Sequence, residues 1–171
     1  LTSIIVCPAT LVYNWEREIK KFTSSLISTI HIGDNRIKNP NTLSQFDIII
    51  TSYQTLLKDI KFFEQIAFQY TILDEAHYIK NRDSQIFKAI NRINTINKVS
   101  LSGTPIENSL ADLWSQMEFI NPDILGTYPS FKKVFQDSIE RYKDEEAMAE
   151  LKKLLSPFIL RRTKKEVLND L

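Results

Sequence analysis

The chain contains few of the residues that mark several specialised classes of protein. It has one cysteine, which excludes an internal disulfide framework, and its two histidines leave too few ligands for a zinc site of cysteine and histidine. Three glycines and six prolines among 171 residues exclude a collagen-like or low-complexity segment. No apolar run approaches the roughly 20 residues of a membrane-spanning helix, and the first residues lack the basic start and cleavage site of a signal peptide. We therefore expect a reducing, cytosolic setting.

The residues that are present describe a globular domain. The chain is 43% hydrophobic and 25% charged, and 171 residues suffice for one domain with a core. Its net charge of +1 neither requires nor excludes a nucleic-acid partner. Because the sequence opens without methionine in an apolar, strand-like run, we predict that it is a piece of a longer protein.

Short apolar runs alternate with segments of helical periodicity. Strands are predicted over 3–7, 29–32, 47–51, 70–73, 98–102 and 158–160, and helices over 11–22, 53–63, 110–120, 130–138 and 144–155, with one more after Asp83–Ser84. Residues 36–44 are predicted as loop. Continuously apolar strands between helices indicate an α/β fold, a parallel sheet covered on both faces. Beyond residues 103–105 the pattern becomes helical, with no further strand before 158–160.

An acidic pair follows the apolar run that ends at Leu73. In parallel sheets ligands bind beyond the carboxyl ends of the strands, which is where Asp74 and Glu75 stand. One carboxylate at such a place can engage Mg²⁺, and a second can orient or deprotonate an attacking water. The pair would equally suit the start of the next helix, since acidic groups favour a helix N-terminus. Taken alone, the two residues leave both interpretations open.

A second polar turn follows the next predicted strand. Ser102 and Thr104 offer hydroxyls on either side of Gly103, which permits a tight turn. Such a turn can sense a carboxylate or phosphate on the neighbouring strand, or it can simply connect a strand to a helix.

Three further residues have structural interpretations. Trp15 shares a helical face with Leu11 and Ile19, which favours a place in the core over stacking on DNA. Cys7, inside a strand, is interpreted as a small apolar core residue. His31 has no motif beside it and is interpreted as a buried, hydrogen-bonded histidine.

In combination and in this order, the segments resemble the SWI/SNF-type (sucrose non-fermenting) ATPases of helicase superfamily two. Residues 4–18 look like motif Ia with its helix, and residues 50–56 look like the second nucleic-acid motif, Ib. Asp74-Glu75-Ala76-His77 matches motif II, the Walker B or DEAH box, and residues 101–108 match motif III. Residues 155–167 are similar to the segment that leaves the first lobe of this family, which separates it from other DEAH-box proteins. The resemblance spans nearly the whole chain.

The resemblance implies a partial RecA-like ATP-binding lobe over residues 1–120 and a helical protrusion with an exit segment over 121–171. It implies ATP and Mg²⁺ as cofactors, with Asp74 helping to coordinate Mg²⁺ and Glu75 positioning the hydrolytic water. His77 would couple the nucleotide site to DNA. The motif III turn would relay the state of the nucleotide between two lobes through Ser102, Gly103 and Thr104.

The resemblance also implies a track for double-stranded DNA, formed by Pro8, Ala9, Thr10, Thr51 and Ser52. These residues would mainly contact phosphates, so we expect salt-sensitive binding that is independent of DNA sequence. Arg161 and Arg162 belong to a basic segment, 152–165, that contains no acidic residue. They would contact either DNA phosphates or the second RecA-like lobe of the same chain, and the sequence leaves both open.

Two parts of the family pattern are missing from the sequence. No Gly-Lys pair occurs, so the phosphate-binding loop that ends in Gly-Lys-Thr is absent. That loop supplies the amides and the lysine that cradle the triphosphate, and in the family it precedes the motif Ia strand. The second lobe is absent as well. We therefore expect this chain alone to be inactive as an ATP hydrolase.

The resemblance implies part of a DNA-dependent ATPase that translocates on double-stranded DNA and remodels protein–DNA complexes, without strand separation. The alternative is a non-enzymatic, degenerate lobe that binds DNA or a protein. A conventional helicase is a third possibility, which residues 160–164 weaken. Glu107 stands where many eukaryotic remodellers of the family carry glutamine, which favours a prokaryotic parent and a cytoplasmic location; a eukaryotic parent would place the protein in the nucleus.

Overall fold

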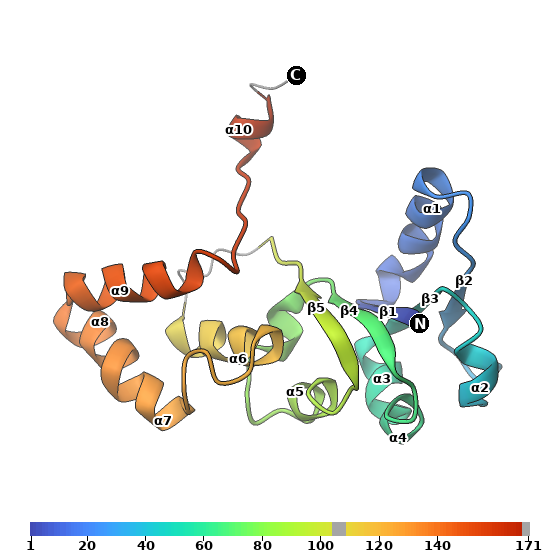
Figure 1. The fold of residues 1–171 in the computed structure, drawn as a ribbon, viewed down its shortest axis with the longest axis horizontal. Coiled ribbons are helices and arrows are strands. Elements are labelled where there is room, and N and C mark those ends of the chain that lie inside the picture. Colours follow the sequence, from blue (N-terminus) through green and yellow to red (C-terminus); the bar gives the residue numbers. More distant parts are fainter. Residues whose placement is uncertain (104–108, 169–171) are drawn as a thin grey trace. The chain divides into compact units, whose positions relative to one another are not determined.

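The computed structural model describes residues 1–103 and 109–168, and it divides into two compact units, Leu1–Leu125 and Gly126–Leu171 (Figure 1). The division falls five residues beyond the predicted boundary at 120/121. In the described ranges, no helix is long and apolar enough to cross a membrane.

The first unit is built on a five-stranded sheet with the order β2-β3-β1-β4-β5. Every neighbouring pair is parallel, which confirms the predicted α/β fold with a parallel sheet. The strands are β1 (Thr2–Cys7), β2 (Ser28–His31), β3 (Ile48–Ser52), β4 (Phe68–Leu73) and β5 (Thr95–Ser100). Strands β1 and β3 are buried on both faces, which is why each reads as a continuous apolar run in the sequence.

Helices cover both faces of this sheet. Helix α1 (Val12–Phe22), preceded by the 3₁₀ turn η1 (Ala9–Leu11), lies on one side, and α3 (Tyr53–Lys58) and α4 (Ile60–Phe63) lie on the other (Figure 1). The remaining elements of this unit are α2 (Pro40–Leu43), the 3₁₀ turn η2 (Ala76–Ile79), α5 (Gln85–Ile90) and α6 (Leu110–Ile120). Ser84 caps α5 by accepting from the amide of Phe87, as its position before the helix predicted.

Under α1, a hydrophobic cluster joins the helix to the sheet. Val12 and Ile19 pack on Ile5, Cys7 and Ile50, and Trp15 lies partly buried against them. Burial, and then the charge of Asp74, raise the pKa of the Cys7 thiol to about 12. Cys7 is therefore the inert core residue that its place in the strand predicted.

The second unit is helical. It contains α7 (Tyr128–Phe131), a π-helical turn η4 (Lys132–Gln136), α8 (Asp137–Tyr142), α9 (Glu145–Leu155) and α10 (Lys164–Leu168). Its buried side chains are Phe131, Phe135, Ile139, Ala147, Leu151 and Leu155. The predicted strand at 158–160 is wrong, because these residues follow α9 in a turn and extended chain without a strand partner.

Two further predictions about elements were wrong in part. The predicted loop 36–44 contains α2, because the side chain of Asn39 accepts from the amides of Asn41 and Thr42 and so starts a helical turn. The predicted helix 53–63 is broken at Asp59 into α3 and α4.

Asp59 is the centre of a partly buried polar network. Its Oδ2 lies 2.8 Å from Nε2 of His31, and Arg36 donates to both carboxylate oxygens, at 2.6 Å and 2.9 Å. His31 is 1% exposed and contacts the rings of Phe62 and Phe63. His31 is thus the buried, hydrogen-bonded histidine that the sequence predicted, and the network ties β2 and its following loop to the α3–α4 junction.

Protonation of His31 should make the stability of the protein depend on pH. Burial lowers the pKa of His31, and the Arg36 hydrogen bonds lower that of Asp59. Below pH 6.5, the ordinary pKa of histidine, His31 is protonated in the unfolded chain but stays neutral in the folded protein. Because the unfolded chain then binds more protons, the free energy of unfolding should decrease as the pH falls. Asp59 loses its contribution only at still lower pH. Urea denaturation at about pH 7.5 and about pH 5.5 measures this decrease in the free energy of unfolding. The decrease should be smaller in His31→Gln than in the wild type, and equal decreases in the two proteins would contradict this account.

Candidate active site

Because the strands are parallel, the polar turns after β1, β3, β4 and β5 meet at one edge of the sheet. This edge collects the predicted site residues Pro8, Ala9, Thr10, Thr51, Ser52, Asp74, Glu75, His77, Ser102 and Gly103. Thr104, the last of the predicted coupling residues, lies outside the described residues.

Main-chain hydrogen bonds fix the acidic turn to the strands on either side of it. The amide of Asp74 donates to the carbonyl of Val6 in β1 at 2.8 Å. On the other side, the amide of Leu101 donates to the carbonyl of Leu73 at 2.7 Å, and the amide of Ala76 donates to the carbonyl of Leu101 at 3.0 Å. The turn after β4 is therefore part of the sheet framework.

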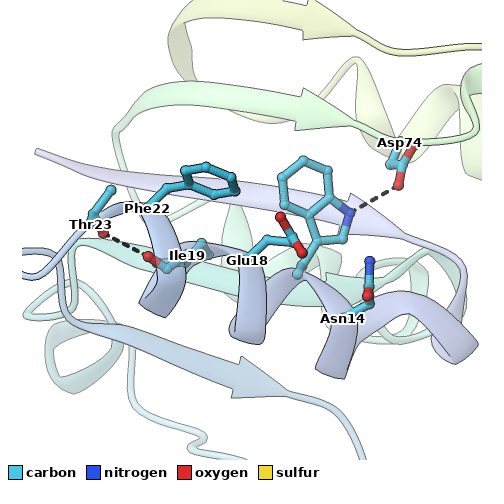
Figure 2. Close-up of a pocket in the computed structure, with 7 residues that line it drawn as sticks. Asn14, Glu18, Ile19, Phe22, Thr23 and Asp74 are labelled. Atoms are coloured by element: carbon cyan, nitrogen blue, oxygen red, sulfur yellow. Dashed lines mark hydrogen bonds between the residues drawn. The ribbon is translucent and has the colours of Figure 1, made fainter.

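The carboxylate of Asp74 is held at both oxygens. Oδ2 accepts from the indole Nε1 of Trp15 at 2.9 Å, which Figure 2 draws as a dashed line, and Oδ1 accepts from the amide of Glu75 at 2.9 Å. Trp15 packs against the core as predicted, but the sequence analysis missed its bond to Asp74. Each oxygen keeps a lone pair for a further partner.

Glu75 adopts an unusual backbone conformation. With φ 52° and ψ 54° it lies in the left-handed region, which residues with a Cβ rarely occupy and which clusters at functional sites. Its side chain is 40% exposed, and its Oε2 lies 3.3 Å from Nδ1 of His77, whose side chain is 42% exposed. Asp74, Glu75 and His77 are all half-buried, so the three side chains remain partly accessible while hydrogen bonds fix the Asp74 carboxylate.

Tyr53 is a second residue at this site that the sequence analysis missed. Its side chain is fully buried, and its hydroxyl donates to the main-chain carbonyl of Asp74 at 2.6 Å. Its ring stacks on Tyr78 with 4.5 Å between centroids and 1° between planes. A buried tyrosine needs a partner for its hydroxyl. The sequence signal that could have indicated this role is a tyrosine directly after a buried strand.

The predicted DNA-track residues differ in accessibility. Ala9 and Thr10 are exposed and Pro8 is half-buried, so all three can contact a ligand. Thr51 and Ser52 are buried: the hydroxyl of Thr51 donates to the carbonyl of His31 at 2.7 Å, and that of Ser52 caps α3. Both hydroxyls are thus already bonded inside the protein, and the place of Thr51 and Ser52 along a DNA track stays a prediction.

The motif III turn is described as far as residue 103. Ser102 and Gly103 are exposed. Gly103 has no positive φ, and a Cβ there would meet no atom within 4 Å. The backbone conformation of Gly103 is therefore one that other residues can also adopt. Arg161 and Arg162 are exposed in the second unit.

A pocket opens between α1 and Asp74. It has a volume of about 410 Å³, and its walls include Trp15, Ile19 and Phe22, with Asp74 at one end (Figure 2). No group of three or more histidine, cysteine, aspartate or glutamate residues in the described ranges could hold a metal ion. A cation at Asp74 would thus take most of its ligands from water or a bound molecule, which is how Mg²⁺ is usually held beside phosphates.

Comparisons with known proteins agree with this architecture. The family model for the SNF2-related domain matches residues 2–171. A TATA-binding protein-associated factor of Arabidopsis thaliana is 40% identical over 184 residues, covering 99% of this chain and 9% of the relative. An uncharacterized ATP-dependent helicase of Mycoplasma genitalium is 40% identical over 172 residues, covering 100% of this chain and 16% of the relative.

A solved structure is similar over nearly the whole chain. The SWI2/SNF2 ATPase core of Sulfolobus solfataricus in complex with double-stranded DNA matches with a TM-score of 0.90 and 42% identity, over 99% of this chain and 36% of that one. The chain therefore spans about a third of that core and less than a fifth of the two curated relatives.

Proposed function

This chain belongs to the SNF2-related domain family, and on that premise we propose that it is part of a DNA-dependent ATPase that moves along double-stranded DNA and remodels protein–DNA complexes. The observation that carries the proposal is the acidic turn after β4. Asp74 is fixed by the protein, while Glu75 and His77 remain accessible at the edge where Ala9 and Thr10 are exposed. A degenerate lobe would have no need for this arrangement.

The residues at this edge fit ATP with Mg²⁺. Asp74 presents two carboxylate oxygens with one lone pair each to spare, which suits a cation that takes few protein ligands and several phosphate or water oxygens. When bound, Mg²⁺ would neutralise charge on the phosphates. We propose that Asp74 helps to hold it and that Glu75 orients the attacking water from its exposed position.

The turn also fits the DEAH-box assignment of the sequence. We propose that His77, 3.3 Å from Glu75, couples the nucleotide site to DNA, and that Ser102, Gly103 and Thr104 relay the nucleotide state to a second RecA-like lobe. Under this proposal residues 1–120 form the partial RecA-like lobe and 121–171 the protrusion and exit segment.

We propose that double-stranded DNA lies against the turn after β1. Ala9 and Thr10 are exposed there, and we propose that Pro8, Thr51 and Ser52 lie along the same track. For Arg161 and Arg162 we propose the same two alternatives, a contact with DNA phosphates or a contact with the second lobe. The proposed location is cytoplasmic for a prokaryotic parent and nuclear for a eukaryotic one.

The proposal is tested with the full-length protein. ATP hydrolysis should be stimulated by duplex DNA of any sequence, and the protein should displace a third strand from a triplex without unwinding the duplex. If three to five phosphates are contacted, the logarithm of the DNA-binding constant should fall with the logarithm of the salt concentration with a slope of about −3 to −4.5. Hydrolysis unaffected by duplex would instead support the alternative of a passive interaction module.

A further inference from the structure

Tyr53 connects two turns at the proposed site. It is the first residue of α3 and directly follows Ser52 in the turn after β3. Its hydroxyl donates to the main-chain carbonyl of Asp74, 21 residues away in the sequence. The bond therefore joins the turn after β3 to the acidic turn after β4.

The peptide bond between Asp74 and Glu75 is held at both of its polar groups. Its carbonyl oxygen accepts from Tyr53 at 2.6 Å, and its N–H donates to Oδ1 of Asp74 at 2.9 Å. The peptide plane cannot rotate without breaking one of these bonds. Glu75 follows at once with φ 52° and ψ 54°, a conformation that persists only where the surroundings fix it. The direction of the Glu75 side chain thus depends on the orientation of this peptide.

Packing keeps the Tyr53 hydroxyl available for this bond. The ring is fully buried and lies flat against Tyr78, with 4.5 Å between the centroids. Tyr78 in turn contacts His77, at 5.0 Å between ring centroids.

We propose that Tyr53 is a positioning residue for Glu75: its hydroxyl holds the Asp74 carbonyl so that Glu75 keeps its left-handed backbone and points its carboxylate at the attacking water. The proposal rests on the proposed function, in which Glu75 orients that water. It adds a residue outside the acidic turn to the machinery of hydrolysis.

The test uses the full-length protein with Tyr53→Phe, which removes only the hydroxyl. The kcat of duplex-stimulated hydrolysis should fall by about tenfold, while the KM for ATP and the half-saturating duplex concentration stay unchanged. Amide hydrogen exchange should be faster at residues 74–76 and unchanged in β1 and β3. Tyr142→Phe, which removes an exposed hydroxyl in the second unit, is the matched control and should behave as the wild type.

Three outcomes would overturn the proposal. One is a Tyr53→Phe protein with wild-type kcat. Another is a loss of kcat with faster exchange throughout the sheet and a Tm lowered by more than about 4 °C, which would show a general structural role. The third is a Tyr78→Leu protein, which removes the stacked ring, with wild-type kcat and wild-type exchange at 74–76. A wild-type protein without duplex-stimulated hydrolysis would reject the proposed function instead, so the two failures are distinguishable.

Discussion

Replacing Glu75 with glutamine should lower the kcat of duplex-stimulated ATP hydrolysis in the full-length protein by about 10²–10⁴-fold. Glutamine keeps the size of the side chain and can still contact a water, but it cannot accept the proton. Because the side chain of Glu75 is 40% exposed, the fold should not change. The measurement is steady-state hydrolysis with and without duplex, together with the affinity for ATP.

The affinity of Glu75→Gln for ATP and for duplex DNA should equal that of the wild type, because Asp74 and the turn after β1 are untouched. Glu150→Gln is a suitable control, since it makes the same chemical change on the exposed surface of α9. Retention of more than about a tenth of the wild-type kcat would remove Glu75 from the chemistry and favour the passive interaction module.

The main features of the fold could be predicted because they depend on local patterns. Continuous apolar runs identified β1 and β3, since a strand buried on both faces has no polar side to show. Boundaries were less predictable: β5 begins at Thr95 because Asn97 and Lys98, although polar, pair in register with Tyr70 and Thr71. The break at Asp59 could not be predicted, because it places the carboxylate against Arg36 and His31, which are remote in the sequence.

The site was predictable in its acidic residues and not in the side chains that hold them. Asp74 and Glu75 were found because parallel strands bring their carboxyl ends to one edge. Trp15 and Tyr53 were missed as partners of Asp74 because each ring is apolar except for one atom, and the partner of that atom is decided by tertiary packing. The partner of the Thr51 hydroxyl, the main-chain carbonyl of His31, could not be predicted for the same reason.

The bond between Trp15 and Asp74 leads to the second large prediction. Groups that hydrogen-bond a metal-ligating side chain orient it, and their loss costs about 10–100-fold in metal affinity or activity. Trp15→Phe keeps an aromatic ring against the hydrophobic cluster under α1, and it removes the indole N–H together with the five-membered part of the ring. The carboxylate of Asp74 would then be fixed through Oδ1 alone. We expect the Mg²⁺ concentration for half-maximal hydrolysis to rise by about 10–100-fold.

This prediction separates orientation from packing. If Trp15 only fills space, Trp15→Phe should lower the free energy of unfolding and leave the Mg²⁺ requirement unchanged. If it orients Asp74, calorimetric titration should show weaker binding of Mg²⁺-nucleotide, while binding of nucleotide without the metal stays the same. Tyr13→Phe, a change on the same helix at a side chain that is 61% exposed, controls for effects on α1. Because the indole N–H donates to Asp74 and both residues line the pocket (Figure 2), α1 would then serve the nucleotide site directly as well as covering the sheet.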